Sequence, residues 1–170
     1  MADASLAKDA AQFIVTEAKL FSPLAPGVTH ARYFDQAARN VACIAEMLCR
    51  AERHPEQLSS LGFFVLAPAE QIGERKLFNS LLSKESIKEK VKRRVDEYVG
   101  SREEEQKGQW LQNWFTPTLE HVEVTAISWE EIIKIIREKD ARFGAELLSF
   151  YNECCQFNRI QEPEIAARAQ

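Results

Sequence analysis

The chain has 170 residues, which is enough for one domain with a hydrophobic core. Apolar residues make up 45% of it and charged residues 28%, as in ordinary globular proteins, and no apolar run is long enough to cross a membrane. The formal net charge of -4 argues against a general nucleic-acid-binding domain, because such domains tend to be basic, but it is compatible with a local basic strip.

The first predicted elements form a hairpin. Residues 13–21 give the strongest strand signal, because β-branched and aromatic residues dominate and Ser22–Pro23 ends the run. Residues 4–7 are a candidate partner strand, and residues 8–11 would turn the chain between the two.

Helices and two more strands follow. Apolar residues at helical spacing predict helices over 31–51, 70–82, 83–98, 101–114 and 140–158, and the capping-box pair Ser128 and Glu131 opens another. Apolar runs at 62–68 and 122–126 predict strands, of which the first looks buried on both faces. Alternating strands and helices predict an α/β fold with a small mixed or parallel sheet. We expect a single domain over 1–160, with the C-terminal helices on one face or edge of the sheet, and a polar tail over 161–170.

Two opposite charges interrupt an apolar strand face. Side chains alternate along a strand, so Glu17 and Lys19 share one face with Phe13 and Val15. Because both faces are largely apolar, we expect this strand to be central and covered on both sides. Buried charges are costly unless they are paired or bind a metal, so the pair is either a structural ion pair or part of a functional site.

With Asp3 at the start of the candidate partner strand, this pattern resembles the PD-(D/E)XK nuclease superfamily. In that family an Asp on one strand and Glu-x-Lys on the next bind magnesium and activate water. The resemblance implies a restriction-endonuclease-like fold, with a small mixed central sheet flanked by helices. It implies that Asp3, Glu17 and the backbone carbonyl of Ala18 hold Mg²⁺ or Mn²⁺, and that Lys19 orients water or offsets negative charge.

The helix that follows adds to the resemblance. Several branches of the superfamily place a Gln with a Tyr or an Arg on this helix, facing the active site. Gln36 resembles the catalytic Gln, and Arg39 and Tyr33 resemble substrate-binding groups, Arg being suited to paired hydrogen bonds with phosphate. The alternative is that Gln36 and Arg39 belong to a solvated helix turn.

The motif support covers roughly the first 70 residues. Ala2 stands where the family's name has proline, and only two residues precede Asp3, where the family core has a helix and a strand. The sequence therefore leaves open a truncated chain or a missing strand supplied by a partner chain.

These residues predict a magnesium-dependent nuclease that hydrolyses phosphodiester bonds, with DNA as the first expected substrate. Two alternatives stay open. The chain could be a catalytically inactive nuclease-fold protein that serves as a structural or nucleic-acid-binding module. It could also be an unrelated α/β domain in which Glu17 and Lys19 form an ion pair on an exposed edge strand.

Two later features have both a functional and a structural interpretation. The six basic residues between Lys84 and Arg94 could follow a phosphate backbone, but a solvated helix face with i, i+4 pairs is favoured. The aromatic cluster of Trp110, Trp114 and Phe115 could stack on bases, but it is more often core or a dimer contact.

The remaining composition bears on location and partners. None of the four cysteines forms a Cys-x-x-Cys pair and the three histidines are scattered, so zinc-ligand spacing is absent. The N-terminus lacks the pattern of a signal peptide, and a reducing cytoplasm fits best. We expect nucleic acid as a partner and no membrane association, and the sequence is compatible with a homodimer.

Overall fold

The computed structural model describes residues 6–73 and 78–158 as an α/β fold with a three-stranded sheet. The strands are β1 (Gln12–Ala18), β2 (Ser60–Ala67) and β3 (Glu123–Ser128). The helices are α1 (Gln36–Arg50), α2 (Ala69–Gly73), α3 (Lys84–Asp96), α4 (Glu104–Trp110), α5 (Thr116–His121), α6 (Trp129–Lys139) and α7 (Ala141–Asn158). A 3-10 turn, η1 (Pro55–Gln57), precedes β2, and a π-helical turn, η2 (Leu111–Phe115), joins α4 to α5. Within these residues, no helix is long and apolar enough to span a bilayer.

The sheet is parallel throughout the described residues, in the order β1-β2-β3. Of the two expected arrangements, a mixed or a parallel sheet, the described strands form the parallel one. Residues 4 and 5 of the predicted partner strand at 4–7 lie outside the described residues, and residues 6 and 7 are not part of a strand. A turn is present at Lys8–Asp9 as expected. β2 is central, but the burial expected on both of its faces is complete only on the inner one, because Phe64 and Leu66 on the other face are half-buried.

β1, in contrast, is an edge strand among the described strands. The prediction that it is central and covered on both sides is therefore wrong for this part of the chain. Its inner face packs on the core through Phe13 and Val15, whereas Ile14 on the other face is 43% exposed. The period-two alternation itself is confirmed, since exposed and half-buried residues alternate along β1.

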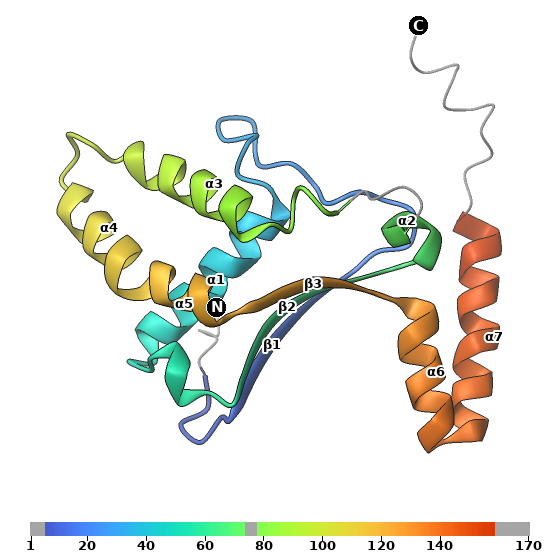
Figure 1. The fold of residues 1–170 in the computed structure, drawn as a ribbon. Helices are drawn as coiled ribbons and strands as arrows, with labels where there is room; N and C mark the ends of the chain where they lie inside the picture. The colour runs from blue at the N-terminus through green and yellow to red at the C-terminus, as the bar shows by residue number, and fades with distance from the viewer. Residues whose placement is uncertain (1–5, 74–77, 159–170) are drawn as a thin grey trace, which may run out of the picture.

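The hydrophobic core lies between one face of the sheet and the helices α1, α3, α4 and α5 (Figure 1). From α1 it takes Ala38, Val41, Ile44 and Leu48, which recur at helical spacing and are fully buried. Phe63 and Val65 of β2 meet them from the sheet. This layer places the N-terminus of α1 beside the end of β1.

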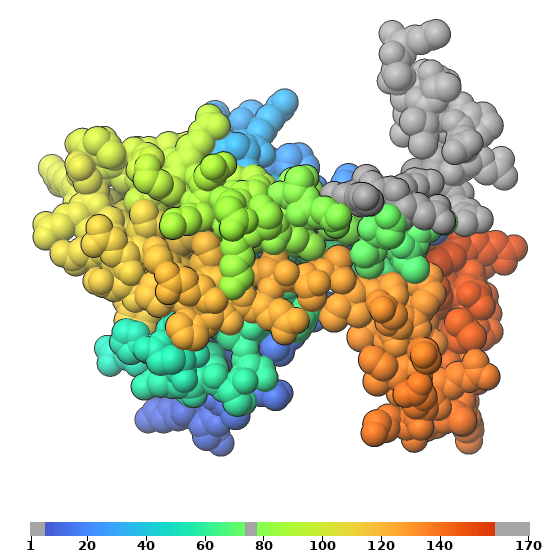
Figure 2. Space-filling view, viewed as in Figure 1, coloured from blue at the N-terminus to red at the C-terminus, as the bar shows by residue number. Residues whose placement is uncertain are grey.

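The C-terminal helices, which were expected on one face or edge of the sheet, cover neither of its faces in the described part of the chain (Figure 1). The α6–α7 hairpin extends from the carboxyl end of β3 and stands beside the body of the molecule (Figure 1). α6 contacts β3 and α7. In the space-filling view a hollow separates the α6–α7 hairpin from the part of the molecule that holds α1, α3, α4 and α5 (Figure 2).

The capping box that starts α6 is confirmed. The Ser128 hydroxyl accepts from the Glu131 N–H at 3.1 Å, and the Glu131 carboxylate accepts from the Ser128 N–H at 3.0 Å. These bonds from the Ser128 N–H and hydroxyl lower the pKa of Glu131. The Glu131 carboxylate therefore stays ionised, and able to accept these hydrogen bonds, down to a lower pH than a free glutamate.

Replacing Ser128 with Ala is expected to lower the free energy of unfolding by about 1 kcal/mol, the usual cost of losing a side-chain N-cap. Urea unfolding followed by circular dichroism measures this loss. A matched Ser149→Ala change, in the exposed middle of α7, should leave the free energy of unfolding almost unchanged. Equal effects of the two substitutions would contradict the role given to the cap.

Candidate functional site

Three of the predicted site residues meet at the carboxyl end of β1. The Lys19 ammonium lies 3.0 Å from a Glu17 carboxylate oxygen and donates to the Gln36 side-chain oxygen at 2.9 Å. The Lys19 side chain is only 10% exposed and that of Glu17 23% exposed. Lysines are rarely this buried unless they are paired. β1 is an edge strand among the described strands, as in the alternative interpretation, but the pair lies on its inner face and is mostly buried.

Gln36 is held by two separate contacts at the first turn of α1. Its side-chain oxygen also accepts from the Ala25 N–H at 3.0 Å, which ties it to the loop after β1. Asp35 caps the helix by accepting from the Ala38 N–H at 3.0 Å. The Gln36 oxygen is thus used twice, and its amide N–H donors are left for water or a ligand.

The Asp35 carboxylate also pairs with Lys90 of α3, at 2.6 Å. Both side chains are mostly buried, at 9% and 18% exposure. This ion pair joins the start of α1 to α3, and it therefore fixes the position from which Gln36 reaches Lys19.

The first turn of α6 closes the same end of the sheet. The Trp129 indole N–H donates to the Lys19 carbonyl at 2.7 Å. Tyr151 of α7 donates its hydroxyl to Glu130 at 2.8 Å, and the other oxygen of Glu130 accepts from the Ala69 N–H at 3.0 Å. Burial, together with this bond to Glu130, raises the pKa of Tyr151, so it remains a donor at neutral pH.

The backbone of β1 presents the Ala18 carbonyl at an unpaired edge. In a parallel ladder, alternate residues direct their N–H and C=O to the same neighbour. Ala11 and Lys19 both bond toward β2, through Ser59 N–H and Leu66 C=O, so the odd-numbered residues face β2. The Ala18 carbonyl consequently points away from β2. No other strand occupies that side among the described residues.

The oxygens at this place fit a hard divalent cation. Mg²⁺ is usually bound by one or two carboxylates together with water and substrate phosphate. Glu17 supplies a carboxylate beside the free carbonyl edge at Ala18. The third predicted ligand, Asp3, lies outside the described residues, and within those residues no group of three His, Cys, Asp or Glu side chains gathers as a metal site.

The two predicted substrate-binding residues have different surroundings. Arg39 is half-buried one turn along α1 from Gln36, and its guanidinium has no side-chain partner in the described part of the chain. Tyr33 instead packs on α3: its hydroxyl bonds to Glu97, and the Arg93 guanidinium lies 3.9 Å from its ring centre. Burial and the neighbouring Glu97 raise the pKa of Tyr33.

The basic strip on α3 is largely engaged within the protein. Lys90 and Lys92 form ion pairs, Lys84 donates to the Glu120 carbonyl, and Arg94 pairs with Glu97. Of the aromatic cluster, Phe115 is fully buried and stacks with Trp110, whereas Trp114 stacks on His54. The aromatic cluster thus belongs to the core, as the sequence favoured. On α3, Lys92 and Asp96 form an i, i+4 pair of the expected kind, but Lys84 and Lys90 contact other parts of the fold.

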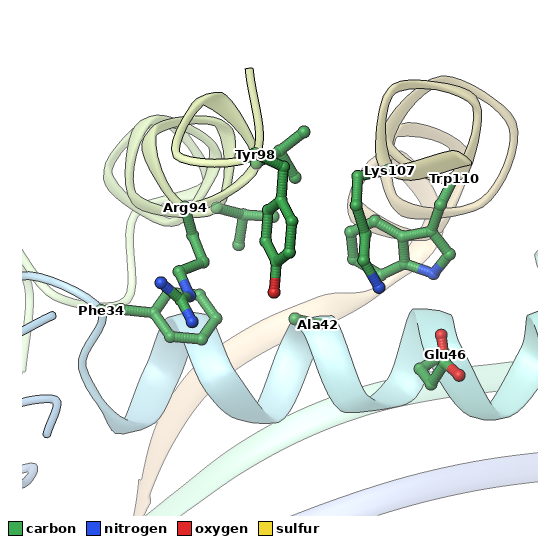
Figure 3. Close-up of a pocket in the computed structure, with 9 residues that line it drawn as sticks. Phe34, Ala42, Glu46, Arg94, Tyr98, Lys107 and Trp110 are labelled. Carbon is green, nitrogen blue, oxygen red and sulfur yellow. The ribbon is translucent and has the colours of Figure 1, made fainter. Parts of the chain in front are cut away.

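A separate pocket of about 150 Å³ opens between α1, α3 and α4 (Figure 3). Tyr98 and Lys107 point into it above Ala42, and Arg94 lies beside Phe34 at one end. The pocket includes none of the residues that form the cluster at the end of β1. Glu17, Lys19 and Gln36, the residues singled out in the sequence, thus lie at the end of β1 and outside this pocket.

Sequence reasoning missed the residues that hold the cluster in place. Asp35, Lys90, Trp129 and Tyr151 come from four parts of the chain and meet only through tertiary packing. A local signal existed for Asp35, since an Asp before a run of helix-forming residues is a good N-cap.

No protein-family model, curated protein or solved structure matches this chain.

Proposed function

We propose that this chain carries the site of a metal-dependent nuclease with a restriction-endonuclease-like fold, which hydrolyses phosphodiester bonds, first of all in DNA. One observation carries the proposal: a nearly buried lysine ammonium is held between a carboxylate and a carboxamide at the carboxyl end of a parallel strand. Ligands of open parallel sheets bind outside that end of the strands.

Each residue of the cluster has a role in such hydrolysis. Glu17 and the Ala18 carbonyl would hold the cation, which when bound polarises the phosphate and lowers the pKa of a bound water. The Lys19 ammonium can position the attacking water and offset the negative charge that builds on the phosphoryl oxygens. Gln36 fixes the Lys19 side chain and offers its amide N–H donors to the same water or to a phosphate oxygen.

Arg39 supports the substrate class. A half-buried guanidinium without a partner in the described part of the chain, one turn from Gln36, suits a phosphate that would bind along α1.

In the reaction the oxygen of water bonds to phosphorus as the bond to the leaving oxygen breaks. The water loses a proton to solvent, and the leaving oxygen takes one up.

The test is the hydrolysis of single- and double-stranded DNA by the wild-type protein with Mg²⁺ or Mn²⁺ and with a chelator. We expect cleavage that needs the metal. Replacing Lys19 with Met is expected to lower the rate about 100-fold or more, because the charge beside the reacting phosphate is lost. Lys134→Met, at an exposed position of α6, serves as the matched control and should cleave like the wild type.

The outcomes separate the proposed function from its alternatives. Metal-dependent cleavage lost only in Lys19→Met supports the nuclease. DNA binding without cleavage in any metal would instead identify an inactive binding module. A protein that neither cleaves nor binds DNA would contradict both, and would leave Glu17 and Lys19 as a structural pair.

A further inference from the structure

An apolar stripe runs the length of α7 and is open to solvent. Its members recur at spacings of four and three residues, the pattern of a coiled-coil seam. They are Phe143, Leu147, Phe150, Cys154 and Phe157, and three of them are among the most exposed large apolar side chains described: Phe143 at 53%, Phe150 at 64% and Phe157 at 82%.

Packing within the hairpin does not account for this stripe. α7 contacts α6 through a different side, where Gly144 lies against Arg137 so closely that a Cβ would be 2.5 Å from the Arg137 Cα, and where Tyr151 packs on Trp129. At 100° per residue the stripe is turned about a quarter of a revolution from that side.

The exposed area is that expected for the centre of a protein interface. The three phenylalanines together expose close to two complete side chains, or about 300–500 Å². That equals the largest apolar patch of a typical monomer, before Leu147 is added. A stable dimer buries about 800 Å² on each partner, with an apolar centre and a polar rim, so this patch is large enough to supply the centre.

We propose that this stripe is the surface through which two copies of the chain pair, with α7 of each copy parallel to α7 of the other. Charge selects this direction. Glu146 and Glu153 flank the stripe on one side, so an antiparallel pairing would bring Glu146 near the partner's Glu153. A parallel pairing puts these residues on opposite sides of the seam, and it brings Cys154 next to the partner's Cys154.

The position of α7 allows this arrangement. It is the outermost helix of the hairpin, with α6 between it and the sheet (Figure 1). A two-fold axis alongside α7 would therefore place the second copy away from the body of the first. The pairing does not depend on the proposed nuclease function.

The first test is the mass of the protein in solution, measured by light scattering at micromolar concentration. We expect twice the chain mass of 19.4 kDa. Phe150→Glu is expected to weaken the dimer at least about 100-fold, because a charge would enter the seam. The matched control Asn152→Glu adds the same charge on the opposite side of α7 and should remain dimeric.

The second test is disulfide formation with diamide. A variant that keeps Cys154 and has Ala at the other three cysteine positions should form a cross-linked dimer, whereas a variant that keeps only the neighbouring Cys155 should not. A monomeric wild type would overturn the proposal, and so would a Phe150→Glu variant that stays as dimeric as Asn152→Glu. Cross-linking through Cys155 as fast as through Cys154 would overturn the parallel arrangement.

Discussion

Replacing Glu17 with Gln is expected to reduce metal-dependent DNA cleavage at least about 1000-fold, a loss typical of removing a central catalytic group. The substitution keeps the size of the side chain, and its amide oxygen still accepts a hydrogen bond from Lys19. What it removes is the negative charge that a hard cation needs. The effect should therefore fall on catalysis and metal binding, with little change in the free energy of unfolding.

The control for this change is Glu123→Gln. Glu123 is an exposed carboxylate at the start of β3, so the substitution alters the net charge equally but leaves the end of β1 intact. We expect this variant to cleave DNA like the wild type. If Glu17→Gln retained more than a tenth of the wild-type rate, Glu17 would have no part in holding the metal.

Replacing Lys90 with Met is expected to lower the free energy of unfolding by about 3 kcal/mol, near the lower end for breaking a buried ion pair. The physical cause is the Asp35 carboxylate, 9% exposed, which would lose its counter-charge and keep only its bond to the Ala38 N–H. Chemical denaturation of both proteins at neutral pH measures the difference.

Lys92→Met is the matched control for the Lys90 substitution. Lys92 lies on the same helix and pairs with Asp96, but both side chains are more than half exposed. Exposed i, i+4 pairs contribute only about 0.3–0.5 kcal/mol, so this variant should be almost as stable as the wild type. Gln36, which accepts a hydrogen bond from Lys19, directly follows Asp35. Loss of the Asp35–Lys90 pair should therefore also disturb Gln36 and lower the cleavage rate of Lys90→Met. Equal stabilities of the two variants would show that the Asp35–Lys90 pair does not anchor α1.

The part of the site that could be predicted from the sequence is the part set by local geometry. Strand alternation alone places Glu17 and Lys19 on one face, and the apolar residues around them predict that this face is buried. The capping box at Ser128 is likewise a local signal, and it is present as hydrogen bonds in the structure.

The start of α1 shows where local signals fail. Residues 31–34 continue the helical pattern, yet they form a loop that folds back on Gly27, where a Cβ would be 1.8 Å from the Ala31 carbonyl oxygen. Tertiary packing of that loop outweighs helix propensity, and the helix begins at Gln36, after the Asp35 cap.

Contacts between residues far apart in the sequence could not be predicted from the periodicity of apolar residues. The edge position of β1 depends on which segments pair beside it, and the contact of Trp129 with Lys19 joins residues 110 positions apart. The bounds of α7 were predictable from the sequence, but the direction in which α6 and α7 leave the sheet is set by the chain's path after β3, which the capping box at Ser128 does not specify.

The most direct test of the central claim, that Glu17 holds a divalent metal beside Lys19, is the effect of Mn²⁺ on the tryptophan indole N–H signals in the NMR spectrum. Trp129 donates to the carbonyl of Lys19, next to the proposed ligands, whereas Trp110 stacks on Phe115 in the helical layer. Paramagnetic Mn²⁺ should broaden the Trp129 signal first in the wild type, and this selective broadening should disappear in Glu17→Gln. Unchanged signals in the wild type, or the same broadening in both proteins, would contradict the claim.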